Sequence, residues 1–242
     1  MKIKDKVLVG FPVGGSCHPA FTKSLCNLQK YELLNPSDDY EILDIEYSAS
    51  LYVQENRNIL VELAQNAGAN WLLQIDTDEE FEPIALRQLM KSANKEHYPI
   101  VSGLYSNIMK GNAEAEGYYY HMDMVYREIG TGEYTNLLIP SDSHPFEVDA
   151  VGSGFLLTHM SIYDRIEYPW FWVELIKPTG KARPQIMNED IAFSRVVREA
   201  GYRILVDPRV EIVHYKSIGL SPSTFTHFIN RAEQVEKEMR AL

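Results

Sequence analysis

The residues best suited to chemistry form the acidic run Asp76-Thr77-Asp78-Glu79-Glu80, directly after an apolar stretch. The apolar stretch Trp71 to Ile75 predicts a buried strand that carries the acids to the edge of a sheet. Side chains two residues apart on an extended chain point to the same side, so Asp76 and Asp78 could reach one cation. Such oxygen ligands suit a hard divalent metal that holds a diphosphate. For an isolated pair at this spacing, a solvated acidic turn is the alternative.

A second acidic site opens a helix. Asn188-Glu189-Asp190 precedes an amphipathic pattern that stops at Gly201. Acids at a helix start are a common structural arrangement, so helix capping is one interpretation. Two carboxylates are more than capping requires. We therefore expect Asp190 to stay ionised near neutral pH and to serve as a general base that takes a proton from an attacking hydroxyl.

Two basic side chains stand where they could join these acids. Arg57 lies in the first turn of a predicted helix, Val53 to Ala67, where the helix dipole disfavours a cation unless an anion is bound nearby. Exposure to solvent is the alternative for this arginine. His214 lies near the end of a predicted strand, Val210 to Tyr215, with Val210 and Ile212 on the same side. A neutral imidazole there would complete a site begun by two aspartates, particularly for manganese, although a lone histidine is more often simply hydrogen-bonded.

The elements that must position these groups alternate between strands and helices. A first strand, Lys6 to Phe11, leads into the loop Pro12-Val13-Gly14-Gly15-Ser16 and then into a helix over Pro19 to Leu34. Loops at this place commonly hold nucleotides in open α/β sheets, but a tight turn without a ligand fits equally well. Further predicted strands are Tyr40 to Tyr47, Pro99 to Tyr105, and Phe146 to Gly154, with Phe155 to Leu157 continuing the last. The glycines of Gly152-Ser153-Gly154 would let a ligand approach the backbone or would form a bulge.

Composition narrows the class of protein. The 242 residues are 45% hydrophobic, enough for one sizeable core. The net charge of -11 disfavours tight binding to nucleic acid, although it does not exclude it. Cys17 and Cys26 lack the spacing of metal ligands or of a disulfide framework, so we expect buried thiols in a reducing compartment. With no signal-peptide pattern and no membrane-spanning run, the expectation is a cytoplasmic protein.

The order of these motifs resembles a known family. Six features carry the resemblance: the Gly/Pro loop after the first strand, Arg57-Asn58, Asp76-Thr77-Asp78, Val151 to Gly154, Glu189-Asp190 and His214. In this order they look like glycosyltransferases of the GT-A fold, closest to family 2-like enzymes. The resemblance covers roughly residues 6 to 216. It implies a single Rossmann-like domain over residues 1–242, with a mixed, mostly parallel sheet flanked by helices. Residues 1–105 would form the nucleotide-binding half, 106–220 the acceptor and catalytic half, and 221–242 a C-terminal helix.

The resemblance also implies a role for each matching residue. Phe11, Pro12, Val13 and Arg57 would contact the nucleotide of a nucleotide-diphospho-sugar donor, and Gly152, Ser153 and Gly154 would lie under its sugar. Asp76 would bind the ribose or the metal, while Asp78 and His214 would coordinate Mn²⁺ or Mg²⁺. Asp190, with Glu189 beside it, would face the acceptor. One departure is the second strand, which ends Leu43-Asp44-Ile45-Glu46-Tyr47 where many relatives carry Asp-Asp-Gly-Ser, so the base is not identified.

The function predicted on this basis is a metal-dependent glycosyltransferase of hexosyltransferase type that moves a sugar to an acceptor hydroxyl. Two alternatives remain open. One is a sugar-phosphate nucleotidyltransferase, which the lack of a long Gly-rich first loop with basic residues argues against. The other is a nucleotide-sugar-binding protein without transfer activity. The acceptor is not identified, but we expect the regions Tyr105 to Tyr134 and Pro169 to Pro184 to shape its site.

Overall fold

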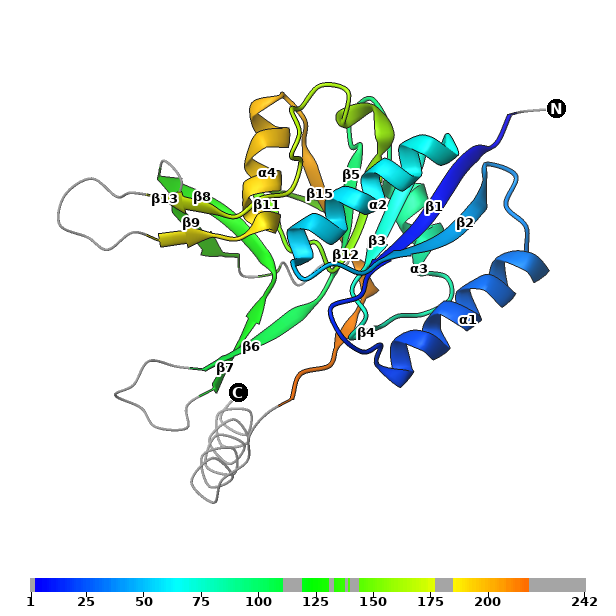
Figure 1. The fold of residues 1–242 in the computed structure, drawn as a ribbon, viewed down its shortest axis with the longest axis horizontal. Helices are drawn as coiled ribbons and strands as arrows, with labels where there is room; N and C mark the ends of the chain where they lie inside the picture. The colour runs from blue at the N-terminus through cyan, green and yellow to red at the C-terminus, as the bar shows by residue number, and fades with distance from the viewer. Residues whose placement is uncertain are drawn as a thin grey trace, which may run out of the picture.

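The computed structural model describes residues 3–110, 119–130, 133–137, 139, 144–176 and 185–217. Its centre is a seven-stranded sheet (Figure 1). The strands follow the spatial order β10 (Phe146–Val148), β15 (Ile204–Glu211), β5 (Ile100–Leu104), β12 (Phe155–His159), β3 (Trp71–Ile75), β1 (Asp5–Pro12) and β2 (Tyr40–Ser48). All but β10 and β12 run in one direction. The mixed, mostly parallel sheet predicted from the sequence is therefore confirmed.

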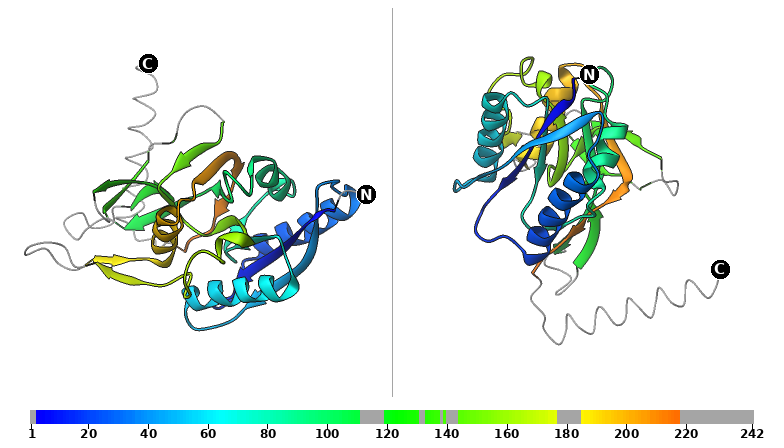
Figure 2. Two further views of the ribbon diagram at one scale, coloured as in Figure 1. Left: turned by 90° about the horizontal axis from the view of Figure 1, so that it is seen from above. Right: turned by 90° about the vertical axis from the view of Figure 1, so that its right-hand side faces the viewer.

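Helices cover both faces of this sheet (Figures 1 and 2). On one face, Leu8 and Leu72 pack with helix α2 (Val53–Ala67) and helix α4 (Glu189–Glu199). On the other, Val9 and Leu73 pack with helix α1 (Pro19–Leu34) and helix α3 (Ala85–Ser92). Because side chains alternate along a strand, consecutive apolar residues serve both layers. None of the helices in the described part of the chain is long and apolar enough to span a membrane.

Smaller sheets extend from the carboxyl ends of the central strands. The pairs are β4 (Glu79–Glu80) with β16 (Val213–His214), β6 (Ser106–Lys110) with β7 (Tyr119–Asp123), and β13 (Glu174–Ile176) with β14 (Gln185–Met187). A three-stranded sheet joins β11 (Ala150–Val151), β8 (Val125–Gly130) and β9 (Glu133–Asn136). A short 3₁₀ helix, η1 (Met160–Ile162), follows β12. The pairing of β4 with β16 brings the acidic run beside His214.

The prediction of one continuous strand over Phe146 to Gly154 is wrong. The chain leaves the central sheet after β10 and joins β8 through β11, and β12 then returns antiparallel to β3. Asp149 marks the crossing, where its carboxylate accepts a hydrogen bond from the backbone of Glu128. Gly152-Ser153-Gly154 thus forms the reversal between two strands.

The prediction of buried thiols is also wrong, because Cys17 and Cys26 are both free and exposed. Cys17 lies in the loop before α1, and Cys26 lies on α1 away from Phe21 and Leu28, which face the core. The predicted C-terminal helix over residues 221–242 lies outside the described residues, as do residues 177–184 of the expected acceptor region. The division of the chain into two functional halves stays a prediction.

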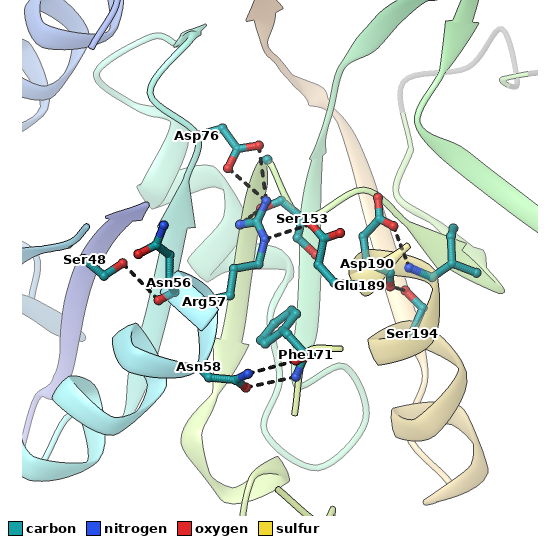
Figure 3. Close-up of polar contacts among 12 residues, drawn as sticks. Ser48, Asn56, Arg57, Asn58, Asp76, Ser153, Phe171, Glu189, Asp190 and Ser194 are labelled. Atoms are coloured by element: carbon teal, nitrogen blue, oxygen red, sulfur yellow. Dashed lines mark hydrogen bonds and ion pairs between the residues drawn. The ribbon is translucent and has the colours of Figure 1, made fainter. Parts of the chain in front are cut away.

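Helix α2 begins at the residue predicted and fixes a distant loop through Asn58. Asn58 is 5% exposed. Its amide nitrogen donates to the carbonyl of Phe171 at 2.8 Å, and its oxygen accepts from the backbone nitrogens of Trp170 and Phe171 at 3.1 and 3.0 Å. Figure 3 shows the bonds to Phe171. One side chain therefore satisfies three backbone groups that a buried loop would otherwise leave unpaired.

Replacing Asn58 with alanine should lower the free energy of unfolding by about 2–4 kcal/mol, because it strands buried backbone groups. Urea denaturation of wild type and variant measures the loss. Asn66→Ala, at an exposed position of the same helix, is the matched control and should change stability by less than about 0.7 kcal/mol. Equal unfolding free energies for the two variants would show that the Asn58 amide does not hold the loop.

Candidate functional site

Arg57 is the point where the separate pieces of the site meet (Figure 3). Its Nη2 lies 2.9 Å from Asp76 Oδ1, its Nη1 donates to the carbonyl of Ser153 at 2.9 Å, and its Nε faces Glu189 Oε1 at 3.5 Å. The arginine is only 2% exposed, so the alternative of solvent exposure is wrong. Burial alone lowers the pKa of Arg57, but the carboxylates of Asp76 and Glu189 outweigh it and raise that pKa above its ordinary value. The anion that this arginine faces is thus formed by the protein itself.

Asp190 lies beside this cluster in the first turn of α4, after the N-cap residue Asn188. Its carbonyl accepts a bond from Ser194 Oγ at 2.8 Å, and the same hydroxyl accepts from the backbone of Val151 at 3.3 Å. The helix start is therefore tied to β11. Burial, reinforced by the charge of Glu189, raises the pKa of Asp190 to about 7. The expectation that Asp190 is fully ionised at neutral pH is corrected accordingly, and such a pKa suits a general base working near pH 7.

Asp78 and His214 form a second cluster, created by the pairing of β4 with β16. His214 Nδ1 lies 3.0 Å from the backbone carbonyl of Ser106, and its Nε2 lies 3.3 Å from Asp78 Oδ2. A carbonyl can only accept a hydrogen bond, so Nδ1 carries the proton. Nε2 faces the Asp78 carboxylate, which can also only accept, so Nε2 donates to it when it too carries a proton and otherwise turns its lone pair toward it. Such a pair of acceptors is stable only with a positive charge between them, either a proton or a metal ion.

The acidic turn is also held by the segment that follows β16. Tyr215 donates its backbone N–H to the carbonyl of Asp78 at 2.8 Å, and its ring stacks on His18 with 3.9 Å between centroids. His18 in turn donates its backbone N–H to the backbone carbonyl of Thr77 at 2.8 Å. Lys216 Nζ lies 2.7 Å from Asp78 Oδ2. Burial tends to raise the pKa of Asp78, but hydrogen bonds from His214 and Lys216 prevail and lower it to about 2.

The predicted metal ligands are only partly brought together. Asp78 and His214 are adjacent, whereas Asp76 turns to Arg57. Within the described ranges, no three His, Cys, Asp or Glu side chains gather closely enough to hold a metal ion by themselves. The donor types of Asp78 and His214 nevertheless fit Mn²⁺ or Mg²⁺, ions that commonly complete their coordination with phosphate oxygens and water. The two residues therefore fit a metal that is held jointly by protein and ligand.

The loop predicted to contact a nucleotide lies at the end of β1. Val13 donates its backbone N–H to the backbone carbonyl of Ser48 at 2.8 Å, which closes the loop against the end of β2. The ring of Phe11 packs edge-on against Phe21 and lies roughly parallel to Tyr47, 6.1 Å between centroids. Pro12 is buried. Phe11 and Val13 are partly exposed, so they stay candidates for contact with a nucleotide.

The two glycines of the Gly-Ser-Gly reversal accommodate protein side chains. A Cβ at Gly152 would lie 1.9 Å from Tyr105 Oη, and one at Gly154 would lie 2.1 Å from Glu79 Oε1. The space that these two glycines leave open is therefore occupied on that side by the side chains of Tyr105 and Glu79. Whether the segment also contacts a donor sugar stays a prediction. Ser153 Oγ is buried and has no hydrogen-bond partner in the described part of the structure.

Glu79 is the residue of the site that the sequence interpretation missed. Its carboxylate is fully buried, and neither oxygen has a hydrogen-bond partner among the described residues. Burial, together with the charges of Asp76 and Asp78, raises the pKa of Glu79 well above its usual range. The sequence signal was its place in the acidic run: Glu79 and Glu80 form β4, and alternation along this strand puts Glu79 on the buried side and Glu80 on the more exposed one.

The aromatic segment near Pro169 divides between the core and the surface. Trp170 and Phe171, which fall in the region expected to shape the acceptor site, are buried in the core. Trp172 and Tyr168 instead line a hollow of about 520 Å³ that also involves Glu199, at the opposite end of α4 from Asp190. The hollow is therefore not adjacent to the predicted base.

Comparison with solved structures shows what this fold is similar to. The crystal structure of A197 from STIV matches 88% of this chain and 86% of that chain, with a TM-score of 0.52 and 18% identity. The crystal structure of GalNAc-T7 with UDP, GalNAc and Mn²⁺ matches 89% of this chain but 44% of that one, with a TM-score of 0.50 and 13% identity. The chain has a GT-A-type α/β fold. No protein-family model and no curated protein matches the sequence.

The buried position of Arg57 gives a test of the site's architecture. Arg57→Met would leave Asp76, Glu189 and the Ser153 carbonyl without their cation, so we expect a loss of about 3–5 kcal/mol in unfolding free energy. Arg57→Lys should be intermediate, because an ammonium lacks the planar fork of a guanidinium. Urea denaturation measures both variants.

The control is Arg203→Met, whose partner Glu147 is 46% exposed. An exposed ion pair of this kind is worth at most about 1 kcal/mol. A loss for Arg57→Met no larger than the loss for Arg203→Met would contradict the organising role of Arg57.

Proposed function

We propose that this protein is a glycosyltransferase that moves a sugar from a nucleotide-diphospho-sugar to an acceptor hydroxyl, with a divalent metal bound at Asp78 and His214. The observation that carries the proposal is the geometry of His214. Its Nδ1 is committed to the Ser106 carbonyl, so Nε2 faces Asp78 Oδ2 at 3.3 Å. A hydrogen bond from Nδ1 to a backbone carbonyl is how proteins orient a histidine whose other nitrogen binds a metal.

The fold and the position of the site support the same function. Asp76 and Asp78 follow β3, at the carboxyl end of a parallel strand, where open α/β sheets bind their ligands. The similar GalNAc-T7 structure contains UDP, GalNAc and Mn²⁺. We infer that the donor of this chain is likewise a nucleoside diphosphate sugar. The loop Phe11 to Val13 is proposed to contact its nucleotide.

Asp190 is proposed as the group that accepts the acceptor's proton if the transfer inverts configuration. A bond forms between the acceptor oxygen and the anomeric carbon, the bond from that carbon to the diphosphate breaks, and the hydroxyl proton passes to an Asp190 carboxylate oxygen. Arg57 orients Glu189 at the neighbouring position and compensates its charge. If the transfer retains configuration, Asp190 orients the substrates instead. A metal bound at Asp78 and His214 supplies positive charge beside the departing diphosphate.

Metal-dependent binding of a nucleoside diphosphate is the first expected result. In a thermal-shift screen of UDP, GDP, CDP, TDP and ADP, each with and without Mn²⁺, we expect one nucleotide to raise the melting temperature only when the metal is present. At a hundredfold excess over its dissociation constant, a ligand adds about 2.7 kcal/mol to the stability of the folded state.

Asp78→Ala should abolish the shift, while Asp164→Ala, at an exposed position outside the site, should retain it. The absence of any shift with metal and all five nucleotides would contradict the proposal. Transfer of sugar, measured by release of nucleoside diphosphate in the presence of acceptors, then separates a transferase from a protein that only binds the donor. Release of inorganic diphosphate from a nucleoside triphosphate and a sugar phosphate would instead indicate a nucleotidyltransferase.

The raised pKa of Asp190 sets the expected pH dependence of transfer in an inverting reaction. The base is active only when it is deprotonated, so kcat/KM should rise with pH and level off above the pKa of about 7. Asp190→Asn should lower kcat by about 10²–10⁴-fold and should leave the metal-dependent nucleotide shift in place. Initial rates across pH 5–9 provide the test. Turnover by the asparagine variant equal to that of wild type would remove Asp190 from this role.

A further inference from the structure

The cation that now neutralises Asp78 comes from the chain itself. Lys216 Nζ lies 2.7 Å from Asp78 Oδ2, the same oxygen that faces His214 Nε2 at 3.3 Å. The ammonium group therefore contacts the carboxylate oxygen that a metal between Asp78 and His214 would have to use. One oxygen serves both cations, so the lysine and the metal compete.

The surroundings of Lys216 hold its backbone in place and leave its side chain free to move. The preceding residue is fixed to the acidic turn by the bond from Tyr215 N–H to the Asp78 carbonyl and by the stack of Tyr215 on His18. The Lys216 side chain is 37% exposed. Four methylene groups and a compact, hydrated charge allow the ammonium to swing by several ångströms without moving the backbone.

We propose that Lys216 is a resident counter-ion of Asp78, which a divalent metal displaces, and that the released ammonium then binds the diphosphate of the donor. The inference rests on the proposed function, because the diphosphate that Lys216 would bind is that of the proposed donor. It goes further by assigning a residue to the coupling between metal and nucleotide. No bond forms or breaks in this exchange; one cation replaces another on a carboxylate, and the first moves to a new anion.

The exchange makes the binding of the metal and the binding of the nucleotide depend on each other. Without a nucleotide, the metal must displace an ammonium that has no other anion to bind, so its affinity is reduced. With a diphosphate present, the displaced ammonium has a new partner, so the metal binds more tightly. By thermodynamic linkage, the metal raises the affinity for the nucleotide by the same factor.

The test is calorimetric titration of Mn²⁺ into wild type, Lys216→Met, Lys216→Arg and Lys30→Met, each with and without UDP or whichever diphosphate binds. Lys30 lies at an exposed position on α1 and serves as the matched control. We expect Lys216→Met to bind Mn²⁺ about fivefold more tightly than wild type without nucleotide, because an exposed ion pair competes by that order. The same variant should lose most of the increase in Mn²⁺ affinity that nucleotide produces in wild type. Lys216→Arg should retain that increase.

Equal affinity of Lys216→Met, Lys30→Met and wild type for Mn²⁺ would overturn the inference, as would absence of Mn²⁺ binding in all of them. A thermal melt of each variant checks that it is folded, and Lys216→Arg preserves the charge if the methionine variant is not. The proposed function and the counter-ion inference can be contradicted independently of each other. Tighter Mn²⁺ binding by Lys216→Met without any transfer activity in wild type would support the counter-ion and contradict the transferase, while activity with unchanged Mn²⁺ affinity would do the reverse.

Discussion

The burial of one guanidinium group determines how the site is assembled. Arg57 is 2% exposed, and a buried charge is tolerated only when partners surround it. Its partners come from the end of β3, the reversal before β12 and the start of α4. If the arginine and its carboxylate partners were all replaced together by apolar side chains of similar volume, stability could be comparable, but nothing would then dictate where three carbonyl or carboxylate groups point. The ion pairs of Arg57 therefore fix the positions of its partner groups more than they add to stability.

The residues on either side of Arg57 extend the same constraint to other loops. Asn56 accepts the backbone N–H of Ser50 through its side chain, and its own carbonyl accepts from Ser48 Oγ at 3.0 Å. Asn58 holds the loop at Phe171. Three consecutive buried polar residues at the start of α2 thus fix the end of β2, the acidic turn and the aromatic loop at once. A rigid helix start is a suitable place for such contacts, because its backbone is already ordered.

The sequence predicted the local structure well and the partnerships poorly. Helix α2 has the bounds Val53–Ala67 that hydrophobic periodicity predicted, because that signal is contained within the helix itself. The shared orientation of Asp76 and Asp78 was expected from strand alternation, but β3 ends at Ile75 and the chain turns, with Glu79 N–H bonded to the Asp76 carbonyl. Alternation does not apply beyond the end of a strand. The pairing of Lys216 with Asp78 joins residues 138 positions apart, and no local pattern records such a contact.

The balance of charge in the site indicates what kind of ligand it can accept. The acids outnumber the bases: Asp76, Asp78, Glu79, Glu189 and Asp190 face Arg57 and Lys216. Burial and the neighbouring acids raise the pKa values of both Glu79 and Asp190, which favours their protonated forms and lessens this excess. A diphosphate would add negative charge to this surface and would be repelled unless positive charge arrives with it. The same acids that would repel a bare diphosphate would attract a divalent cation, and a diphosphate complexed with such a cation would no longer be repelled.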